Sequence, residues 1–364
     1  MLTQHMATEI VKQTTIRLNR NINIMDERGI IIASGNRKRI NQAHFGAMEV
    51  LKTGKTLIIH ENEPQKWGGS LPGINLPIEF QQQIIGVIGI TGNPKEIMDF
   101  GELVKMITEM MIQQAFVTEQ LEWKQRLKDQ IFEDLLKDTI HPKTIEQRLE
   151  LIDIKLKPPF QVSIMEVGAN ELKKSDLIQL VEDIFTPNEK LIGSLSVNQL
   201  FILTSNLSET NTKQKLVKVL QQLRTKGLSP RIGLGSVVKT ELHIRHSYNE
   251  SISALSLGNN EQPLITYTEV ETKALLNQLD ERTKHLFCER ILGNLSDKLI
   301  ETLEQLYSSN LNLGECAKKM YIHRNSLVYR IKKIKELTGY NPQELNDAIT
   351  LQIAIWLKEM ARMK

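Results

Sequence analysis

The sequence predicts an α+β protein with several domains, and three observations support that prediction. The first third carries short apolar strands around glycine-rich turns, the middle third alternates strands with helices, and the last third has helical spacing throughout. A chain of 364 residues favours two or three domains, each able to bury its own core. We expect the domains to cover residues 1–136, 143–272 and 273–364.

The composition narrows the class of protein. Hydrophobic residues make up 40% of the chain and charged residues 24%, as in soluble globular proteins, and the net charge is only +3. Cys288 and Cys316 lack metal-like spacing and read as reduced thiols. No signal peptide opens the sequence, and no uncharged apolar run approaches the ~18 residues of a membrane span. We therefore expect a cytoplasmic protein that uses no membrane, metal or cofactor.

The first domain is predicted to hold an antiparallel sheet. Helical spacing occurs at 2–19 and 42–53, where Phe45 and Met48 are expected to face inward. A Gly/Pro-rich loop is expected at 68–77. Strand patterns occupy 21–25, 30–34, 57–59, 78–80 and 84–92. This order predicts a sheet with helices on one side, as in small-molecule sensor modules of the PAS type.

Four motifs in this domain carry a specific resemblance: Asn23–Asp26, Ala33–Ile40, Gly73–Pro77 and Ile85–Gly92. In order and spacing they resemble the sugar-diacid recognition domain of the carbohydrate diacid regulators. The resemblance implies that the domain senses a small hydroxy-carboxylate such as glucarate, galactarate or glycerate.

The residues of these loops suit a carboxylate independently of the resemblance. A carboxylate is held by guanidinium and backbone N–H donors, an imidazole can donate to it, and an amide can serve a hydroxyl. The predicted ligand-binding residues are Ser34, Gly35, Arg37, Arg39, His44, Gly73, Ile74 and Asn75. The alternative is a solvated basic loop whose glycines only make turns.

Residues 94–136 are predicted to form a long connector helix, which we count with the first domain from about residue 95. Asp99 is expected to cap its start. Apolar residues follow an imperfect heptad seam that Gln114, Lys124 and Lys128 interrupt. The apolar members are Leu103, Ile107, Met110, Val117, Leu121, Ile131 and Leu135. The spacing favours a dimer helix, and the alternative is a helix packed along its own domain.

The order of strands and helices in the middle domain predicts a ferredoxin-like sheet. It resembles the degenerate GGDEF-like, nucleotide-cyclase-like domain of the same regulators. An active cyclase hairpin needs glycines for the nucleotide and acids for Mg²⁺, whereas the tip here, Ser196–Gln199, has neither. The chain also lacks a Walker motif, His-Glu-x-x-His and Gly-x-Ser-x-Gly. We therefore expect no catalytic residues.

Residues 311–334 predict two short helices joined by a tight turn, which is the layout of a helix-turn-helix. Asn312 can cap the first helix, and the second is expected to begin near Arg324, with Leu327, Ile331 and Ile334 buried. Its other side is rich in basic and polar side chains suited to phosphates and base edges. The predicted DNA-binding residues are His323, Arg324, Asn325, Ser326, Tyr329, Arg330, Lys332 and Lys333. The alternative is a solvated cationic helix.

The stretch Ile322–Gly339 resembles the C-terminal helix-turn-helix of the PucR and CdaR regulators and, more weakly, the DNA-binding end of the factor for inversion stimulation. Val328 departs from the charged residue expected at its position. We therefore predict a ligand-responsive transcriptional regulator that binds double-stranded operator DNA as a homodimer or higher homo-oligomer. The resemblance implies an activator of carbohydrate diacid or glycerate utilisation genes, with RNA polymerase as a further candidate partner.

Three other functions remain open on sequence grounds. One is an enzyme whose middle domain makes or cleaves a cyclic dinucleotide, and the missing metal-binding acids argue against it. The effector of a PucR-like regulator can instead be a nucleotide or purine. A nonspecific architectural protein would bind DNA with an affinity set by salt and no preferred sequence.

Overall fold

The computed structural model describes residues 2–18, 20–61, 67, 70–137, 142–168 and 172–362. The chain divides into two compact units, Met1–Arg126 and Leu127–Lys364. No helix within the described ranges is long and apolar enough to cross a membrane.

The first unit is built on a five-stranded antiparallel sheet in the order β2-β1-β5-β4-β3. A tight turn joins its first two strands, since the Asp26 carboxylate accepts the backbone N–H groups of Arg28 and Ile30, both at 2.9 Å. The strands are β1 (Ile22–Met25), β2 (Ile31–Ser34), β3 (Leu57–Ile59), β4 (Gly73–Phe80) and β5 (Gln83–Thr91).

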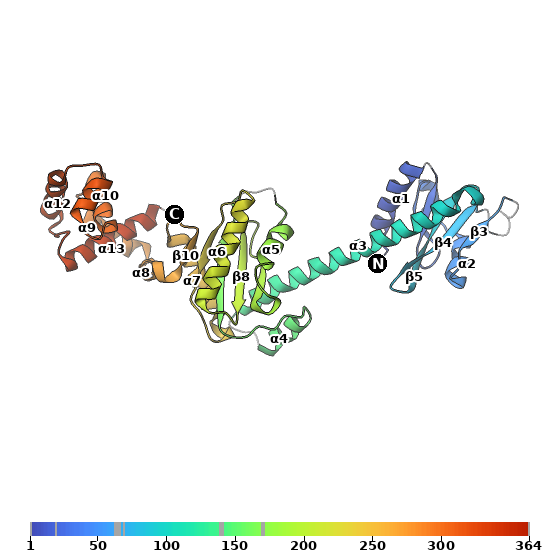
Figure 1. Ribbon diagram of the computed structural model, residues 1–364, viewed down its shortest axis with the longest axis horizontal. Helices are drawn as coiled ribbons and strands as arrows, with labels where there is room; N and C mark the ends of the chain where they lie inside the picture. Colours follow the sequence, from blue (N-terminus) through green and yellow to red (C-terminus); the bar gives the residue numbers. More distant parts are fainter. Residues whose placement is uncertain are drawn as a thin grey trace. The chain divides into compact units, whose positions relative to one another are not determined.

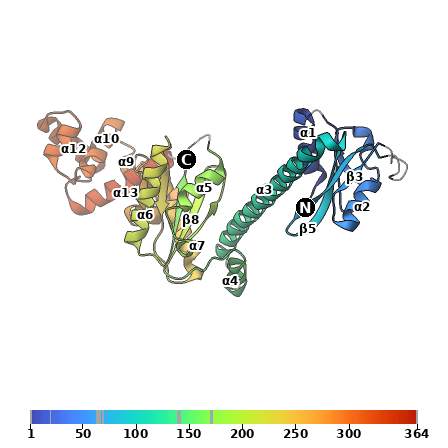
Figure 2. The ribbon, with the colours of Figure 1, turned by 45° about the vertical axis from the view of Figure 1, so that its right-hand side comes forward.

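Helices cover both faces of this sheet, which corrects the prediction that they lie on one side (Figure 2). Helix α1 (Gln4–Leu18) and the first part of α3 (Pro94–Leu135) pack on one face. Helix α2 (Phe45–Thr53) packs on the other, after the short 3-10 helix η1 (Arg37–Arg39). The physical reason is that every residue of β1 is buried, with Ile22 and Ile24 on one face and Met25 on the other, and strands buried on both faces need cover on both.

Two further details of this unit differ from the prediction. The expected loop at 68–77 ends early, because Gly73–Pro77 belongs to β4. A Cβ on Gly73 would lie 2.1 Å from the carbonyl oxygen of Ile90, so the glycine permits close strand pairing there. On α2 the buried residues are Gly46, Ala47 and Val50, whereas Phe45 and Met48 are exposed.

Helix α3 spans Pro94–Leu135, close to the predicted limits, but its start differs. The side chain of Asn93, not Asp99, accepts the N–H of Lys95 (3.2 Å). Ile97, Val104 and Ile112 belong to the core of the first unit. The last turns belong to the core of the second unit, where Phe132 stacks on Phe201 with ring centroids 3.8 Å apart.

The second unit begins with a five-stranded sheet in the order β10-β9-β6-β8-β7. The antiparallel order β9-β6-β8-β7 is that of a ferredoxin-like fold, and β10 adds a parallel edge strand. Helices α5 and α6 lie over one face, while α7 and the end of α3 pack on the other (Figure 1). The strands are β6 (Phe160–Glu166), β7 (Lys190–Ser194), β8 (Gln199–Ser205), β9 (Arg231–Leu234) and β10 (Leu264–Thr266). The helices are α4 (Pro142–Glu150), α5 (Lys174–Glu182), η2 (Pro187–Glu189), α6 (Glu209–Thr225), η3 (Glu241–His243) and α7 (Ile244–Leu257).

The rest of the second unit is helical, as expected for the C-terminal part. Its main core joins α9, α10 and α13 around Ile291, Leu303 and Leu351, and a smaller core lies between α10, α11 and α12. The helices are α8 (Tyr267–Asn277), α9 (Glu281–Leu292), α10 (Asp297–Ser308), α11 (Leu313–Lys319), α12 (Arg324–Thr338) and α13 (Leu345–Arg362).

Candidate functional site

Helices α11 and α12 form the predicted pair. The Asn312 side chain accepts the N–H groups of Gly314 (3.0 Å) and Glu315 (3.1 Å), so it caps α11 as expected. Helix α12 begins at Arg324, and Leu327, Ile331 and Ile334 are its buried residues. The turn between the helices holds Tyr321 at a φ of 54° with its side chain 96% exposed. One face of α12 is therefore fixed in the core, and the other is left to solvent.

The start of α12 presents polar groups to solvent. His323 is the N-cap, and its Nδ1 accepts the N–H of Asn325 at 3.2 Å. His323, Arg324, Asn325 and Ser326 are all exposed. Within the described residues Arg324 forms no ion pair, so its guanidinium is available to a phosphate or a base edge.

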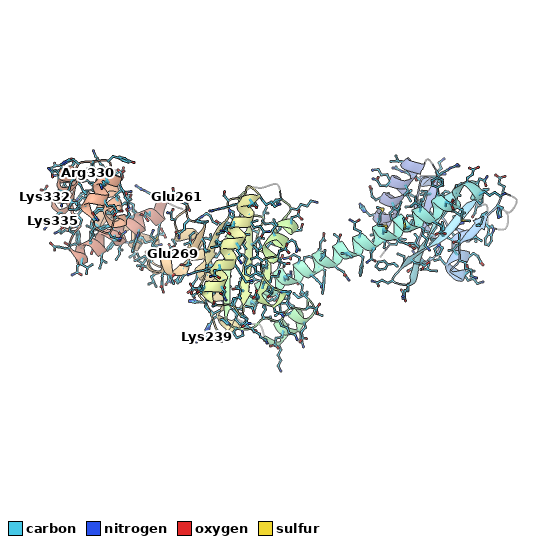
Figure 3. The ribbon with its side chains drawn as sticks, in the orientation of Figure 1. Lys239, Glu261, Glu269, Arg330, Lys332 and Lys335 are labelled. Atoms are coloured by element: carbon cyan, nitrogen blue, oxygen red, sulfur yellow. The ribbon has the colours of Figure 1, made fainter. Side chains whose placement is uncertain are left out.

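The basic residues further along α12 differ in freedom. Lys332 is exposed and unpaired among the described residues, whereas Lys333 forms a 3.3 Å ion pair with Glu336. Arg330 is half-buried, and its Nη1 donates to Thr302 Oγ1 (3.2 Å) on α10. Figure 3 labels Arg330 and Lys332 on these C-terminal helices, together with Lys335. Arg330 thus links α12 to α10 as well as adding positive charge.

A groove of about 650 Å³ lies beside the exposed face of α12. Asn325, Ser326 and Tyr329 line one side, and Ser296 and Lys298 from the start of α10 line the other. Lys298 was missed by sequence reasoning, because it lies outside the helix-turn-helix motif and nothing in its local pattern marks it. The surface that can meet DNA therefore extends from α12 to the start of α10.

In the first unit, a row of polar residues crosses the sheet face beneath α2. Strand pairing places Ser34, Asn23, Gly89 and Asn75 side by side on β2, β1, β5 and β4. Ser34, Asn23 and Asn75 are buried. Gly89 leaves room for the neighbouring amide, since a Cβ there would lie 2.8 Å from Asn75 Oδ1.

Two members of this row, Ser34 and Asn23, are hydrogen-bonded to each other. Ser34 Oγ donates to Asn23 Oδ1 at 2.6 Å and accepts the N–H of Asn36 at 3.0 Å. The side-chain amide of Asn75, by contrast, has no hydrogen bond within the described residues although it is 97% buried. An amide that makes no hydrogen bond to the protein keeps its donors and acceptor for water or a ligand, which makes Asn75 a candidate for ligand contact.

His44 lies next to Asn75, with Gly46 between them. A Cβ on Gly46 would lie 3.2 Å from Asn75 Nδ2 and 3.3 Å from His44 Cε1. The His44 side chain caps α2, because its Nδ1 accepts the N–H of Ala47 at 3.2 Å. Burial, and then the positive charge of Arg39, lower the pKa of His44 to about 4. At neutral pH the ring is therefore uncharged, and its Nε2–H is an unused donor among the described residues.

The remaining predicted ligand residues do not all lie near His44 and Asn75. Arg39 is half-buried, burial lowers its pKa, and it forms no ion pair within the described residues. Arg37 and Gly35 are exposed. Gly73 is fixed by strand pairing, as described above. Ile74 points to the opposite face, into the core beneath α3. The structure thus brings together His44 and Asn75, with the charge of Arg39 acting on His44.

Sequence reasoning missed three members of this cluster: Asn23, Gly46 and Gly89. Asn23 carried a usable signal, since it alternates with the apolar Ile22 and Ile24 in a strand and so faces the other side. The glycines carried none, because their role depends on which strand and helix face them. Among the described residues, no cluster of three or more His, Cys, Asp or Glu side chains can hold a metal ion.

Three parts of the chain match models of known protein families. Family models match residues 2–135 as a sugar diacid recognition domain, 137–257 as a GGDEF-like domain and 299–357 as the PucR C-terminal helix-turn-helix domain. The carbohydrate diacid regulator of Escherichia coli K12 is 29% identical, over 97% of both chains. The chain belongs to the carbohydrate diacid regulator family.

Two further relatives are similar to this chain. An uncharacterised protein of Haemophilus influenzae is 30% identical, over 98% of this chain and 99% of its own length. The DNA-binding transcriptional activator AdeR of Bacillus subtilis is 23% identical, over 55% of this chain and 52% of its own length. Together with the helix-turn-helix match, these relatives identify the protein as a DNA-binding transcriptional regulator of mixed α+β structure with a GGDEF-like central domain.

Proposed function

We propose that this regulator is an activator that responds to a small hydroxy-carboxylate, of the glucarate, galactarate or glycerate type, bound in its first unit. The observation that carries the proposal is the pair of side-chain donors, His44 Nε2–H and the amide of Asn75, beside the start of α2. Both lie on residues that are at least 95% buried, and neither donates to a protein group within the described residues. The strand order β2-β1-β5-β4-β3 supports the interpretation of this unit as a PAS-like sensor.

The electrostatics of the site favour an anion. Helix N-termini carry partial positive charge and free N–H groups, and α2 points its N-terminus at this cluster. Arg39 adds a full positive charge that no acidic side chain of the described residues neutralises. A carboxylate would accept hydrogen bonds from the N-terminus of α2 and pair with Arg39, while a hydroxyl would pair with the amide of Asn75. A neutral sugar lacks the group that Arg39 requires.

The predicted ligand set divides by role under this proposal. His44, Asn75 and Arg39 contact the effector, with Arg37 at the exposed rim. Ser34, Gly35, Gly73 and Ile74 maintain the sheet that holds them. On the DNA side, His323–Ser326, Tyr329 and Lys332 face the operator. Arg330 also links α12 to α10, and Lys333 also pairs with Glu336 within α12.

We further propose that the protein acts as a homodimer or higher homo-oligomer without catalytic residues, with 1–136 as sensor, 143–272 as spacer and 273–364 as DNA reader, and RNA polymerase as a partner at the promoter. Paired readers suit a helix-turn-helix, which binds two half-sites. A nucleotide or purine effector is the alternative, and an enzyme acting on cyclic dinucleotides is disfavoured by the acid-free hairpin tip at Ser196–Gln199.

A thermal-shift screen tests the effector. The purified chain is heated with glycerate, glucarate, galactarate, their neutral sugars and GTP, since a ligand that binds only the folded state raises the melting temperature. We expect a shift with a hydroxy-acid that Arg39→Ala removes, while the exposed Lys38→Ala control keeps it. A shift with GTP alone would replace the hydroxy-acid with the nucleotide alternative.

A further inference from the structure

An exposed apolar stripe runs along α3 in the first unit. Its members Phe100, Leu103, Ile107, Met110, Val117 and Leu121 are each between 38% and 64% exposed. The opposite side of the helix supplies Ile97, Val104 and Ile112 to the core of the unit. Isolated exposed apolar side chains are ordinary, but six in one line along a helix form a continuous surface that water does not favour.

The spacing of the stripe is that of a coiled coil. The positions 100, 103, 107, 110, 114, 117 and 121 alternate steps of three and four, which is the heptad pattern of core positions a and d. Gln114 is the single polar member. A stripe with this period needs another helix of the same period against it, so it is matched by a second copy of itself.

The charges beside the stripe are compatible with a second copy. Lys105 lies 3.0 Å from Glu79 and 3.8 Å from Glu109, and Arg126 pairs with Glu122 at 3.6 Å. These groups are paired within the chain and leave one net negative charge per copy, so repulsion between two copies through them is small. A groove of about 760 Å³, lined by Ile107, Met110, Val117 and Phe80 of β4, lies along the stripe and can receive side chains of the partner helix.

We infer that residues 100–121 of α3 form a parallel, in-register two-helix interface with the same residues of a second copy. This deepens the homodimer of the proposed function and rests on it. Gln114 sets the direction, because a parallel pair in register places it against its own copy, where the two amides hydrogen-bond. An antiparallel pair would place Gln114 against an apolar side chain and leave it unsatisfied.

The mass of the full chain in solution tests the interface. We expect the native protein to run at twice the chain mass of 41.7 kDa, and Leu121→Lys to raise the dimer dissociation constant about tenfold or more. Trp123→Lys is the matched control: it replaces another exposed apolar residue of the same turn, away from the stripe. Equal dimer stability in the two variants would overturn the proposed interface.

Disulfide trapping tests the register. Under mild oxidation we expect Gln114→Cys to give a covalent dimer, and Trp123→Cys and the native chain, whose Cys288 and Cys316 are partly or fully buried, to give none. If Gln114→Cys chains do not cross-link with one another, but a mixture of Ile107→Cys and Gln114→Cys chains does, the two helices run antiparallel and the proposed register is wrong. A native chain that runs as a monomer would remove the homodimer itself, whereas the thermal shift and DNA binding are measured separately and would stand.

Discussion

Two helix N-termini in this protein are built in the same way and set in opposite surroundings. Helix α2 is capped by His44 and α12 by His323, and in each case Nδ1 accepts a backbone N–H at 3.2 Å. His44 is buried, with an unpaired arginine acting on it, whereas His323 is exposed beside Arg324. Both ends favour anions through the helix dipole and free N–H groups.

The difference shows how burial selects the anion. A buried terminus next to Asn75 suits one small carboxylate that leaves water completely, because the buried donors can be satisfied one by one. An exposed terminus suits a phosphate of a long duplex, which stays hydrated and is held through many weak contacts. Under the proposed function, the same local structure serves recognition of an effector in one unit and of DNA in the other.

The largest effect we expect concerns pH and His44. Its pKa in the folded protein is about 4, below the 6.5 of the unfolded chain, so protonation favours unfolding. The stabilisation is complete above about pH 6.5 and is lost as the pH falls toward 4, by at most ~3 kcal/mol. Melting temperatures of the native chain and His44→Asn between pH 7.5 and 4.5 measure it.

Asparagine is a good N-cap and does not titrate, which makes His44→Asn a matched control for the capping bond. The variant should lose less stability than the native chain as the pH falls. Parallel melting curves across the whole pH range would show that His44 is not buried as a neutral ring.

An intermediate effect is expected at the exposed terminus. Arg324→Ala should weaken binding to a duplex selected by the native protein from a random pool by about 10- to 100-fold, since one arginine contact to DNA contributes about 1–3 kcal/mol. Arg282→Ala, an exposed arginine in the first turn of α9, is the control. Fluorescence anisotropy at fixed salt measures both. Equal affinities would remove Arg324 from the DNA surface.

The smallest effect on stability should come from Gly89→Ala. The added methyl group would lie 2.8 Å from Asn75 Oδ1, at the end of a side chain that can turn away. We expect a loss of about 1 kcal/mol of stability, in the range of overpacking, together with loss of the effector-induced thermal shift. Gly168→Ala, at an exposed position where the added methyl group would meet nothing within 4 Å, controls for a change at glycine. An unchanged thermal shift in Gly89→Ala would place the effector away from Asn75.

Local signals predicted much of this structure. The heptad-like spacing predicted the C-terminal end of α3 to within one residue. The Asn312 cap and the buried stripe of Leu327, Ile331 and Ile334 predicted helices α11 and α12. These elements depend on residues close together in the chain. Family resemblance added the order of the domains, which local patterns leave open.

The candidate effector site was only partly predictable, because it depends on contacts between residues far apart in the chain. His44, Asn75 and Arg39 were recognised as carboxylate-binding types, but Ile74 was included although strand alternation turns it to the other face. The error follows from treating 73–77 as a loop. Asn23 and Gly89 join the site only through the pairing of β1, β5 and β4, a long-range contact that no short window contains.

The end of α3 limits where recombination can exchange the sensor domain of such a protein. Leu127, Ile131, Phe132 and Leu135 are buried in the core of the second unit, and Asp129 accepts the N–H of Ser194 at 3.0 Å. A gene fusion that joins a foreign sensor after residue 136 would delete this helical segment and open a cavity over Phe201. Recombination that keeps both partners folded must therefore cut the chain before Leu127, inside the helix rather than after it.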